Sequence, residues 1–418
     1  MKLEILNEKE YDKFALKHKD ISIYQLSSWG KLKNKTGWKS HLVGFKENNK
    51  IVCATLLLEK STPIKKSLFY APRGFLIDSK DFELLNTFTR EIINYIKSKK
   101  GFMLKIDPNV IYKVRNNKNE VIENCEEEFN NYKNCGFKHF GFTEDFETLQ
   151  PRNLCRFTLS DTYEKTLETF QKSTRKNIIK AESMGVKTEV IKDNEIDEFM
   201  RLLNMAGDKN DFIVRPKWYY ELMRNLFKNE VTFYLTYLDT KDYLQYLKNR
   251  ITDIKKDLEE LKIKFEKYNV GDKLKKEKET LESSLTKYKE LLKTEKEKYK
   301  NIERINIGAL MSVFTGSDGI TFMSGTDPKY KNFYPKYSYY NEHIKDTLKR
   351  NLKYVNFYGI SGNLDPNSKY YSIYEIKKGF NPDVIELLGE FDYIINKVDY
   401  NLYKLALKAY KLIKKIKH

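Results

Sequence analysis

The stretch "GFMLKIDPN" at 101–109 and its later counterpart "YVNFYGISGNLDPN" at 354–367 decide the fold. Each is an apolar run rich in β-branched and aromatic residues that ends in Asp-Pro-Asn, a pattern that predicts a strand closed by a turn. Each also follows a predicted helix, at 81–99 and at 338–351. Because this arrangement occurs twice, it indicates that one α/β unit has been duplicated.

The elements before these two strands repeat in the same order. In the first copy we predict helices at 8–18 and 26–35, followed by strands at 40–45, 51–59 and 67–77. In the second copy we predict helices at 194–206 and 216–227, followed by strands at 231–238, 305–316 and 319–326. The assignments rest on period-two alternation in the strands and on Gly, Pro and Asn at the breaks. We therefore expect a mixed α/β protein with one unit over 1–150 and a second over 151–396.

An insertion over 240–304 separates two strands of the second copy, where the first copy has only the turn "KENNK". Apolar side chains in the insertion recur at alternating steps of three and four, at Leu244, Leu247, Ile251, Ile254, Leu258, Leu261 and Phe265 and again from Leu281 to Ile302. Lys and Glu fill most other positions, and "YNVGDK" interrupts the pattern. This is typical of an antiparallel coiled-coil arm of two helices.

Composition limits the classes of function. The 418 residues carry a formal net charge of +18, and 40% of them are hydrophobic, which favours about two packed domains and an anionic partner such as nucleic acid, a phosphorylated substrate or anionic lipid. The first residues turn polar before any signal-peptide core forms, and no apolar run is long enough to span a bilayer. Four Cys without a CxxC pair and five His indicate a reduced, cytoplasmic chain without a metal site.

The segment "KSTRKNIIKAESMGV" at 172–186 predicts a short helix with Ser173 or Thr174 at its N-cap. Four cations crowd it: Lys172, Arg175, Lys176 and Lys180. A helix N-terminus already favours anions, so these residues are either a patch that faces phosphate groups or a solvated basic face.

The order of elements in each copy resembles the N-acetyltransferase (GNAT) fold, so we expect two tandem acetyltransferase-like units with the arm inserted in the second. That fold binds the diphosphate of its acyl donor with a Gly-rich turn. The matching segments, at 71–82 and 323–334, contain no such turn. This difference argues against an acyl-CoA donor.

The chain also resembles the Fem family of aminoacyltransferases, through segments spread in family order over nearly its whole length: "SSWGKLKNKTGW" (27–38), "APRGF" (71–75), "LKIDP" (104–108), "STRKNIIKAESMGV" (173–186), "FIVRPKWYY" (212–220) and "YEIKKGFNP" (374–382). The resemblance implies transfer of an amino acid from aminoacyl-tRNA to the stem-peptide amine of a peptidoglycan precursor, lipid-linked or nucleotide-linked. It implies no cofactor beyond the tRNA co-substrate.

The resemblance implies two residues near the reacting atoms. Asp107 matches the family carboxylate that accepts a proton from the attacking amine or orients it, and Lys377 matches a lysine that stabilises the oxyanion or neutralises phosphate. Both assignments have alternatives. Asp107 could simply open the Asp-Pro-Asn turn, as Asp365 does, and Lys378 stands beside Lys377.

Three further residues match substrate contacts of the family. Lys33, with Lys31 as second choice, matches a lysine that meets the diphosphate of the precursor, and Arg215 and Tyr219 match diphosphate and sugar contacts. The segment around Arg215 is also an ordinary helix start. Met323 stands where some relatives have a tyrosine, so one substrate contact is expected to be absent or replaced.

The segment 397–418 predicts a basic amphipathic helix with an apolar face of Leu402, Leu405, Ala406, Ala409, Leu412, Ile413 and Ile416 and lysines on much of the other side. Such a helix either lies on an anionic membrane surface at the inner leaflet or packs on the protein itself. Two alternatives to the whole assignment come from other classes of protein. They are a non-catalytic tRNA-binding protein and an acyltransferase that uses another carrier.

Overall fold

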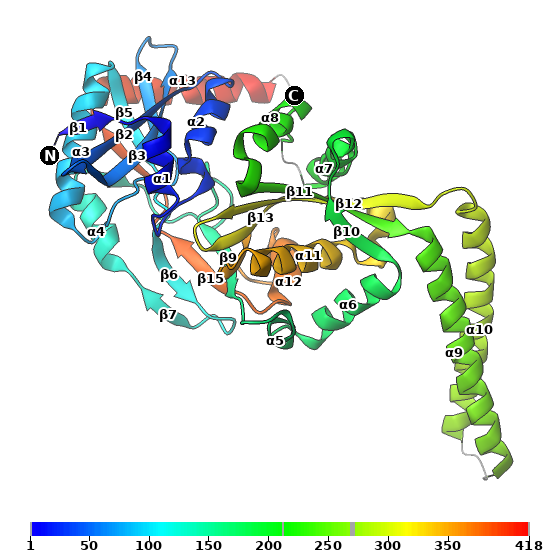
Figure 1. Cartoon of the computed structure of the whole chain (residues 1–418). Coiled ribbons are helices and arrows are strands. Elements are labelled where there is room, and N and C mark those ends of the chain that lie inside the picture. Colours follow the sequence, from blue (N-terminus) through cyan, green and yellow to red (C-terminus); the bar gives the residue numbers. More distant parts are fainter. Residues whose placement is uncertain (1, 211–212, 268–271, 417–418) are drawn as a thin grey trace.

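The computed structural model describes residues 2–210, 213–267 and 272–416, with the side chains of 210, 266–267 and 410–416 left out. Two mixed β-sheets lie next to each other, helices cover them, and a long pair of helices projects from one side (Figure 1). The structure confirms the predicted fold class of two acetyltransferase-like units with an inserted arm.

The first sheet has seven strands in the order β1-β2-β3-β4-β5-β16-β8. Their bounds are β1 Leu3–Ile5, β2 Lys39–Glu47, β3 Lys50–Ser61, β4 Ser67–Ala71, β5 Gly101–Ile106, β8 Lys138–His139 and β16 Phe391–Ile394. The helices of this part are α1 Glu8–Ala15, α2 Ser27–Asn34, α3 Phe82–Ser98 and α4 Glu126–Asn134. Helix α3 buries Leu85, Phe88 and Ile92 against the sheet, which explains its strong apolar periodicity.

The second sheet has nine strands in the order β10-β11-β12-β13-β14-β9-β15-β6-β7. Their bounds are β6 Ile111–Arg115, β7 Val121–Asn124, β9 Asn153–Thr158, β10 Val186–Val190, β11 Val231–Asp239, β12 Arg304–Thr315, β13 Asp318–Thr326, β14 Tyr354–Ile360 and β15 Asp383–Leu387. The associated helices are α5 Tyr163–Glu168, α6 Lys172–Ser183, α7 Ile196–Asn210, α8 Lys217–Phe227, α11 Pro335–Lys349 and α12 Tyr371–Lys378.

The duplication is visible in the pairing of the strands. In the first copy β1 to β5 are neighbours in chain order, antiparallel up to the parallel pair β4–β5, and in the second copy β10 to β14 repeat this with the parallel pair β13–β14. Helix α3 joins the first parallel pair and α11 joins the second, as parallel strands require a crossover. The repeat predicted from the two Asp-Pro-Asn strands is therefore a repeat of the whole unit.

The two sheets exchange strands, which the sequence did not indicate. Strand β16, near the C-terminus, pairs with β5 in the first sheet, whereas the hairpin β6–β7 follows β5 directly and pairs with β15 in the second. Sheet membership therefore does not change at a single point near residue 150. Because the chain crosses between the sheets more than once, the two copies share backbone hydrogen bonds and cannot separate as independent domains.

Helices α9 (Thr240–Lys267) and α10 (Asp272–Lys298) form the arm between β11 and β12. Thr240 anchors its base, where its backbone N–H donates to Glu303 O at 3.1 Å and its hydroxyl donates to Ile302 O. Leu247, Ile254 and Leu261 are buried along the seam, in agreement with the predicted spacing. The turn predicted at 268–273 falls largely outside the described residues.

The C-terminal helix α13 (Lys397–Ile416) packs through two tyrosines. The Tyr400 hydroxyl donates to Asp392 Oδ2 at 2.8 Å, and the Tyr403 ring lies 5.4 Å from that of Phe102. Leu402 and Leu405, from the predicted apolar face, remain 48% and 62% exposed. The side chains of Leu412, Ile413 and Ile416 lie outside the described residues. No helix in the described part of the chain has the length and apolar character needed to cross a bilayer.

Candidate functional site

Asp107 follows the last residue of β5 and is buried, with 2% of its surface exposed. Its Oδ1 accepts the backbone N–H of Arg73 at 2.9 Å, a residue 34 positions away. Asp365 behaves differently: it is exposed, and its Oδ1 accepts the N–H of Asn367 at 2.8 Å within its own turn. The same Asp-Pro-Asn sequence therefore has a local role at 365 and a long-range one at 107.

The loop that carries Arg73 is fixed by a buried glutamine. Gln25 is fully buried, donates from Nε2 to Pro72 O at 2.7 Å and accepts the N–H of Leu56 at 2.9 Å. Arg73 itself has a left-handed backbone (φ 55°), which is uncommon for a residue with a side chain and persists only where the surroundings hold it. This conformation points the Arg73 N–H at Asp107.

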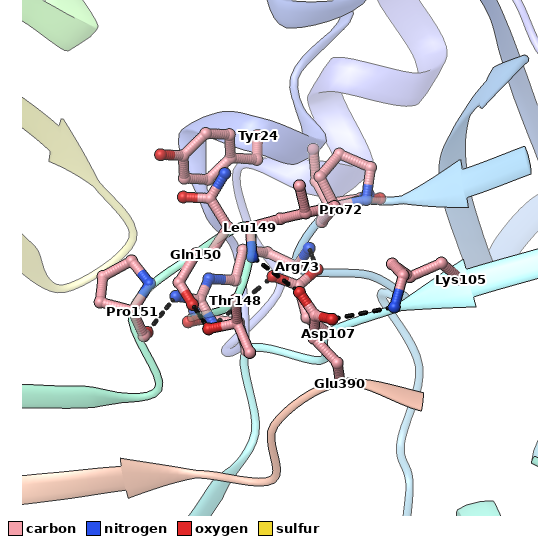
Figure 2. A network of polar contacts seen from close by, with 12 residues as sticks. Tyr24, Pro72, Arg73, Lys105, Asp107, Thr148, Leu149, Gln150, Pro151 and Glu390 are labelled. Carbon is pink, nitrogen blue, oxygen red and sulfur yellow. Dashed lines mark hydrogen bonds and ion pairs between the residues drawn. The ribbon is translucent and has the colours of Figure 1, made fainter. Parts of the chain in front are cut away.

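The Arg73 guanidinium joins the two sheets. Its Nη1 lies 3.8 Å from Asp107 Oδ2, and its Nη2 donates to Pro151 O at 2.7 Å, just before β9 of the second sheet (Figure 2). Glu390, next to β16, accepts from Lys105 and from the N–H of Leu149 at 2.8 and 2.7 Å. These contacts hold residues 148–151, where the chain crosses from the first sheet to the second, close to Asp107.

The environment of Asp107 suits a proton acceptor. Burial raises the pKa of its carboxyl group to about 6, although the charge and N–H of Arg73 act in the opposite direction. Its Oδ2 is buried, lies 3.8 Å from Arg73 Nη1 and is close to the buried hydroxyl of Tyr70. A carboxylate with a pKa near 6 can take a proton from a bound group.

A second cluster gathers cations around aromatic rings. Lys33 Nζ lies over the rings of Trp29 and Trp38 at 5.9 and 5.7 Å, and Lys60 Nζ lies 5.2 Å from Trp38. Burial, followed by the positive charges of Arg215 and Lys60, lowers the pKa of Lys33 to about 8. Among the described residues no carboxylate pairs with any of these three cations, so an anionic ligand would relieve their repulsion.

The geometry separates the two candidate lysines of α2. Lys31 pairs with Glu8 at 2.5 Å, whereas Lys33 faces Arg215. Arg215 lies 6.0 Å from the ring of the buried Tyr219. The structure therefore brings Lys33, Arg215 and Tyr219 into one place, and it adds Lys60. Met323, which stands where some relatives have a tyrosine, accepts a hydrogen bond on its sulfur from the Tyr220 hydroxyl at 3.5 Å.

Lys377 belongs to a third cluster, on the second copy. It is 7% exposed and donates to Gly359 O at 2.8 Å, whereas Lys378 is exposed. Burial lowers the pKa of Lys377, and the charge of Lys336 adds to the effect; burial and the charge of Lys209 do the same for Lys336. Lys336 stands in the first turn of α11, whose N-cap residue makes no side-chain hydrogen bond. An open helix N-terminus beside paired lysines favours an anion.

Helix α6 presents the basic patch predicted from the sequence. Lys172, Lys176 and Lys180 are exposed, and Lys180 donates to the Tyr334 hydroxyl at 3.3 Å. The predicted N-cap is wrong: the helix begins at Lys172 after Gln171, and no side chain caps it. Thr174 is instead buried against α12, where a Cβ added at Gly379 would lie 2.1 Å from its Oγ1.

The structure therefore gathers the predicted residues into separate groups. Lys172, Arg175, Lys176 and Lys180 share α6, which meets the end of α12 that carries Lys377: Gln171 N–H donates to Gly379 O at 2.9 Å. No contact joins Asp107 to Lys377 within the described residues. The sequence analysis did not identify Arg73, Lys60 or Lys336 as site residues. Of the three, only Arg73 lies in a motif that the sequence analysis quoted, "APRGF".

Comparisons with known proteins identify the family. A family model described as the FemAB family matches residues 6–408. The chain belongs to the FemAB family. It is 28% identical over 432 residues to the aminoacyltransferase FemA of Staphylococcus epidermidis, covering 98% of this chain and all of the relative. It is 25% identical over 406 residues to the lipid II:glycine glycyltransferase of Staphylococcus haemolyticus, covering 96% and 94%.

Among solved structures, the crystal structure of FemX matches with a TM-score of 0.78 and 23% identity, over 96% of this chain and 99% of the other. The family match and the named relatives show that this FemAB protein is an aminoacyltransferase. The described ranges contain no group of three or more His, Cys, Asp or Glu residues placed to hold a metal ion.

The raised pKa of Asp107 gives a prediction about stability and activity together. A folded-state pKa of about 6, against 3.8 ordinarily, means that ionisation of Asp107 opposes folding by about 3 kcal/mol at neutral pH. This cost is absent below about pH 4, grows up to about pH 6 and is then constant. We expect Asp107→Asn to melt at or above the wild-type temperature at pH 7.5, to lose that advantage at pH 4, and to lower aminoacyl transfer at least tenfold.

Thermal unfolding at both pH values and a transfer assay check this. Asp365→Asn is the matched control, because that side chain caps only its own turn, and it should change neither property. A destabilised Asp107→Asn protein with normal transfer would contradict the assignment.

Proposed function

We propose that this protein transfers an amino acid from aminoacyl-tRNA to the stem-peptide amine of a lipid-linked peptidoglycan precursor. The observation that carries the proposal is the presence of two cation clusters without paired carboxylates in the described structure, each of which contains at least one partly or fully buried lysine. One consists of Lys33, Lys60 and Arg215, and the other of Lys209, Lys336 and Lys377. Two clusters suit a reaction between two anionic substrates.

The cluster around Lys33 is assigned to the acceptor. A diphosphate offers several oxygens to two lysines and to the planar fork of Arg215, and Trp38 and Tyr219 offer ring faces to a sugar. The relative named a lipid II:glycine glycyltransferase supports a lipid-linked acceptor.

The cluster around Lys336 is assigned to the 3′ end of the tRNA donor, with the exposed cations of α6 along the path of the tRNA backbone. Phosphate contacts need cations on one accessible face, which Lys172, Lys176 and Lys180 provide. The buried Lys377 then lies where it can neutralise charge on the donor ester or its terminal phosphate.

In the reaction, the acceptor amine attacks the aminoacyl carbonyl carbon, the ester bond to the ribose breaks, and the ribose oxygen leaves with a proton. Asp107 takes the proton that the amine loses, since its pKa of about 6 leaves it ionised at neutral pH, and passes this proton to the departing ribose oxygen. No acyl-enzyme forms, and no cofactor is required.

The decisive test of the function supplies the protein with charged tRNA and a muramyl-pentapeptide acceptor and measures the acceptor mass. We expect a gain of one aminoacyl residue or more, which ribonuclease treatment abolishes. Transfer from an aminoacyl thioester but not from charged tRNA would show that another acyl carrier is the donor.

The lowered pKa of Lys33 makes acceptor binding depend on pH. A diphosphate favours the charged lysine, so affinity should be constant below about pH 8 and fall up to tenfold per pH unit above it. Lys33→Arg, which stays charged, should remove this dependence. Calorimetry with nucleotide-linked muramyl-pentapeptide from pH 6.5 to 9.5 measures it. Lys118→Ala, on an exposed turn, is the control, and a flat wild-type profile would refute the role of Lys33.

We also propose that α13 holds the enzyme at an anionic membrane surface. Val398, Leu402 and Leu405 are 67%, 48% and 62% exposed, although the helix is docked through Tyr400 and Tyr403. Lys404 extends the surface to a neighbouring loop, since its Nζ lies 4.7 Å from the ring of Phe140, which is 51% exposed. Apolar side chains flanked by lysines suit a layer of anionic headgroups.

Because Tyr400 and Tyr403 belong to the fold, point substitutions test the membrane proposal better than truncation. The double variant Leu402→Asp, Leu405→Asp should lose most co-sedimentation with anionic phosphatidylglycerol vesicles and keep the wild-type melting temperature. Ile263→Asp, at an arm residue 45% exposed, is the control. Unchanged vesicle binding by the double variant would assign α13 a purely structural role.

A further inference from the structure

One residue of strand β14 has an unusual backbone. Tyr358 is left-handed (φ 60°), at the point where the pairing of β14 with β9 becomes irregular. A bulky residue seldom adopts this conformation, which glycine reaches without strain. The buried Asn356 holds it here, because its Oδ1 accepts the Tyr358 N–H at 2.8 Å. Strain of this kind persists only where the surroundings fix it, and it is concentrated at functional sites.

The side chain of Tyr358 reaches the first copy. Its hydroxyl donates to Gln150 Oε1 at 3.0 Å, in the crossing segment 148–151. The hydroxyl of Tyr24 lies 2.8 Å away and therefore donates to Tyr358. Tyr24 directly precedes Gln25, which fixes the loop that carries Arg73. One side chain of the second copy thus contacts two segments of the first that support Arg73.

The two tyrosine hydroxyls remain protonated at neutral pH. Burial is the main cause, and it raises the pKa of both Tyr24 and Tyr358, although the charge of Arg73 acts in the opposite direction on each. Each hydroxyl can therefore donate a hydrogen bond at the pH where the enzyme works, and the link to Gln150 does not depend on titration.

The residue that follows Tyr358 connects the same turn to Lys377. Gly359 O accepts Lys377 Nζ at 2.8 Å. A Cβ added at Gly359 would lie 2.7 Å from the Cβ of Pro151, so the backbone of β14 approaches the crossing segment closely. Pro151 O in turn accepts the Arg73 guanidinium at 2.7 Å (Figure 2). Contacts therefore run from Lys377 through Gly359 and Pro151 to Arg73, which binds Asp107.

This chain of contacts borders the space between the two sheets. Tyr24 and Arg73 from the first copy and Tyr358 from the second line a cavity of about 120 Å³ there, together with apolar residues of β6, β9, β13 and β15. Tyr358 thus stands where side chains of the two copies meet.

We propose that Tyr358 is a positioning residue for aminoacyl transfer, whose strained turn and hydroxyl fix Lys377 of the second copy relative to Asp107 of the first. This inference rests on the proposed function, which gives Asp107 and Lys377 their roles. The two residues belong to different copies, so neither copy alone sets their separation. A misplacement of about 1 Å can lower a rate about a hundredfold. Tyr358 acts through these two residues and not on the reacting atoms.

Tyr358→Phe keeps the ring and removes the hydrogen bonds of the hydroxyl. We expect kcat to fall at least tenfold and the KM for both substrates to stay unchanged, because the groups that bind the substrates remain in place. Gln150→Leu removes the same link from the other side and should have the same effect. The double variant should lose no more than the more affected single variant, because both substitutions break one interaction.

Steady-state kinetics with whichever acyl carrier the wild type accepts measure these effects, so the test remains valid if the tRNA proposal fails. Tyr95→Phe is the matched control, because the Tyr95 hydroxyl is also hydrogen-bonded, to His41 Nδ1 at 2.9 Å, on the first copy. It should keep the wild-type kcat. Circular dichroism and melting temperatures check that the variants fold.

A lower melting temperature with a normal kcat would make Tyr358 a purely structural residue and overturn the proposal. A raised KM with a normal kcat would make it a substrate contact, which also overturns it. Losses that multiply in the double variant would show that Tyr358 and Gln150 act separately and would contradict the link. A wild type that accepts another carrier but not charged tRNA would refute the donor assignment alone.

Discussion

The buried contact between Arg73 and Asp107 constrains the rest of the site. A carboxylate with 2% exposure is tolerated only where hydrogen bonds and a counter-charge compensate it, and here the compensation comes from a residue whose backbone is itself strained. Gln25 holds that backbone, and Pro151 receives the guanidinium. The contact thus couples the loop after β4, the end of β5 and the segment that enters the second sheet.

The strand exchange lies at the same junction. Strand β16 returns from the second copy to pair with β5, directly before Asp107, and Glu390 beside it binds the crossing segment. Because backbone hydrogen bonds between strands hold this junction together, residues of both copies stay in fixed positions. A reaction between two large substrates needs such positions, because small misplacements of reacting groups are costly.

Net charge by itself says little about where the substrates bind. Several exposed arm lysines, among them Lys256, Lys262 and Lys278, pair with glutamates three or four residues away, and such surface ion pairs contribute little. The informative cations are Lys33, Lys336 and Lys377, whose pKa is lowered by burial and by the charges of neighbouring cations. They oppose folding in the free protein, and an anionic ligand would reverse that effect.

Much of the fold could be predicted from the sequence because its signals are local. Strand alternation, the heptads of the arm and the repeated Asp-Pro-Asn turns each occupy one stretch of chain, and Lys33, Arg215 and Lys377 stood in recognisable motifs. The edge strands β1 and β10, the hairpin β6–β7 and the return of β16 were missed, since short strands are defined by distant partners. Lys60 and Lys336 were missed for the same reason: only the fold brings them to Lys33 and Lys377.

The central claim is that one chain holds its two anionic substrates at separate cation clusters. Steady-state transfer kinetics with each substrate varied in turn test it most directly, using Arg215→Ala and Lys336→Ala. The account predicts that Arg215→Ala raises the KM for the muramyl-pentapeptide about tenfold and leaves that for charged tRNA unchanged, and that Lys336→Ala does the reverse. Two variants that raise the same KM, or neither, would contradict it.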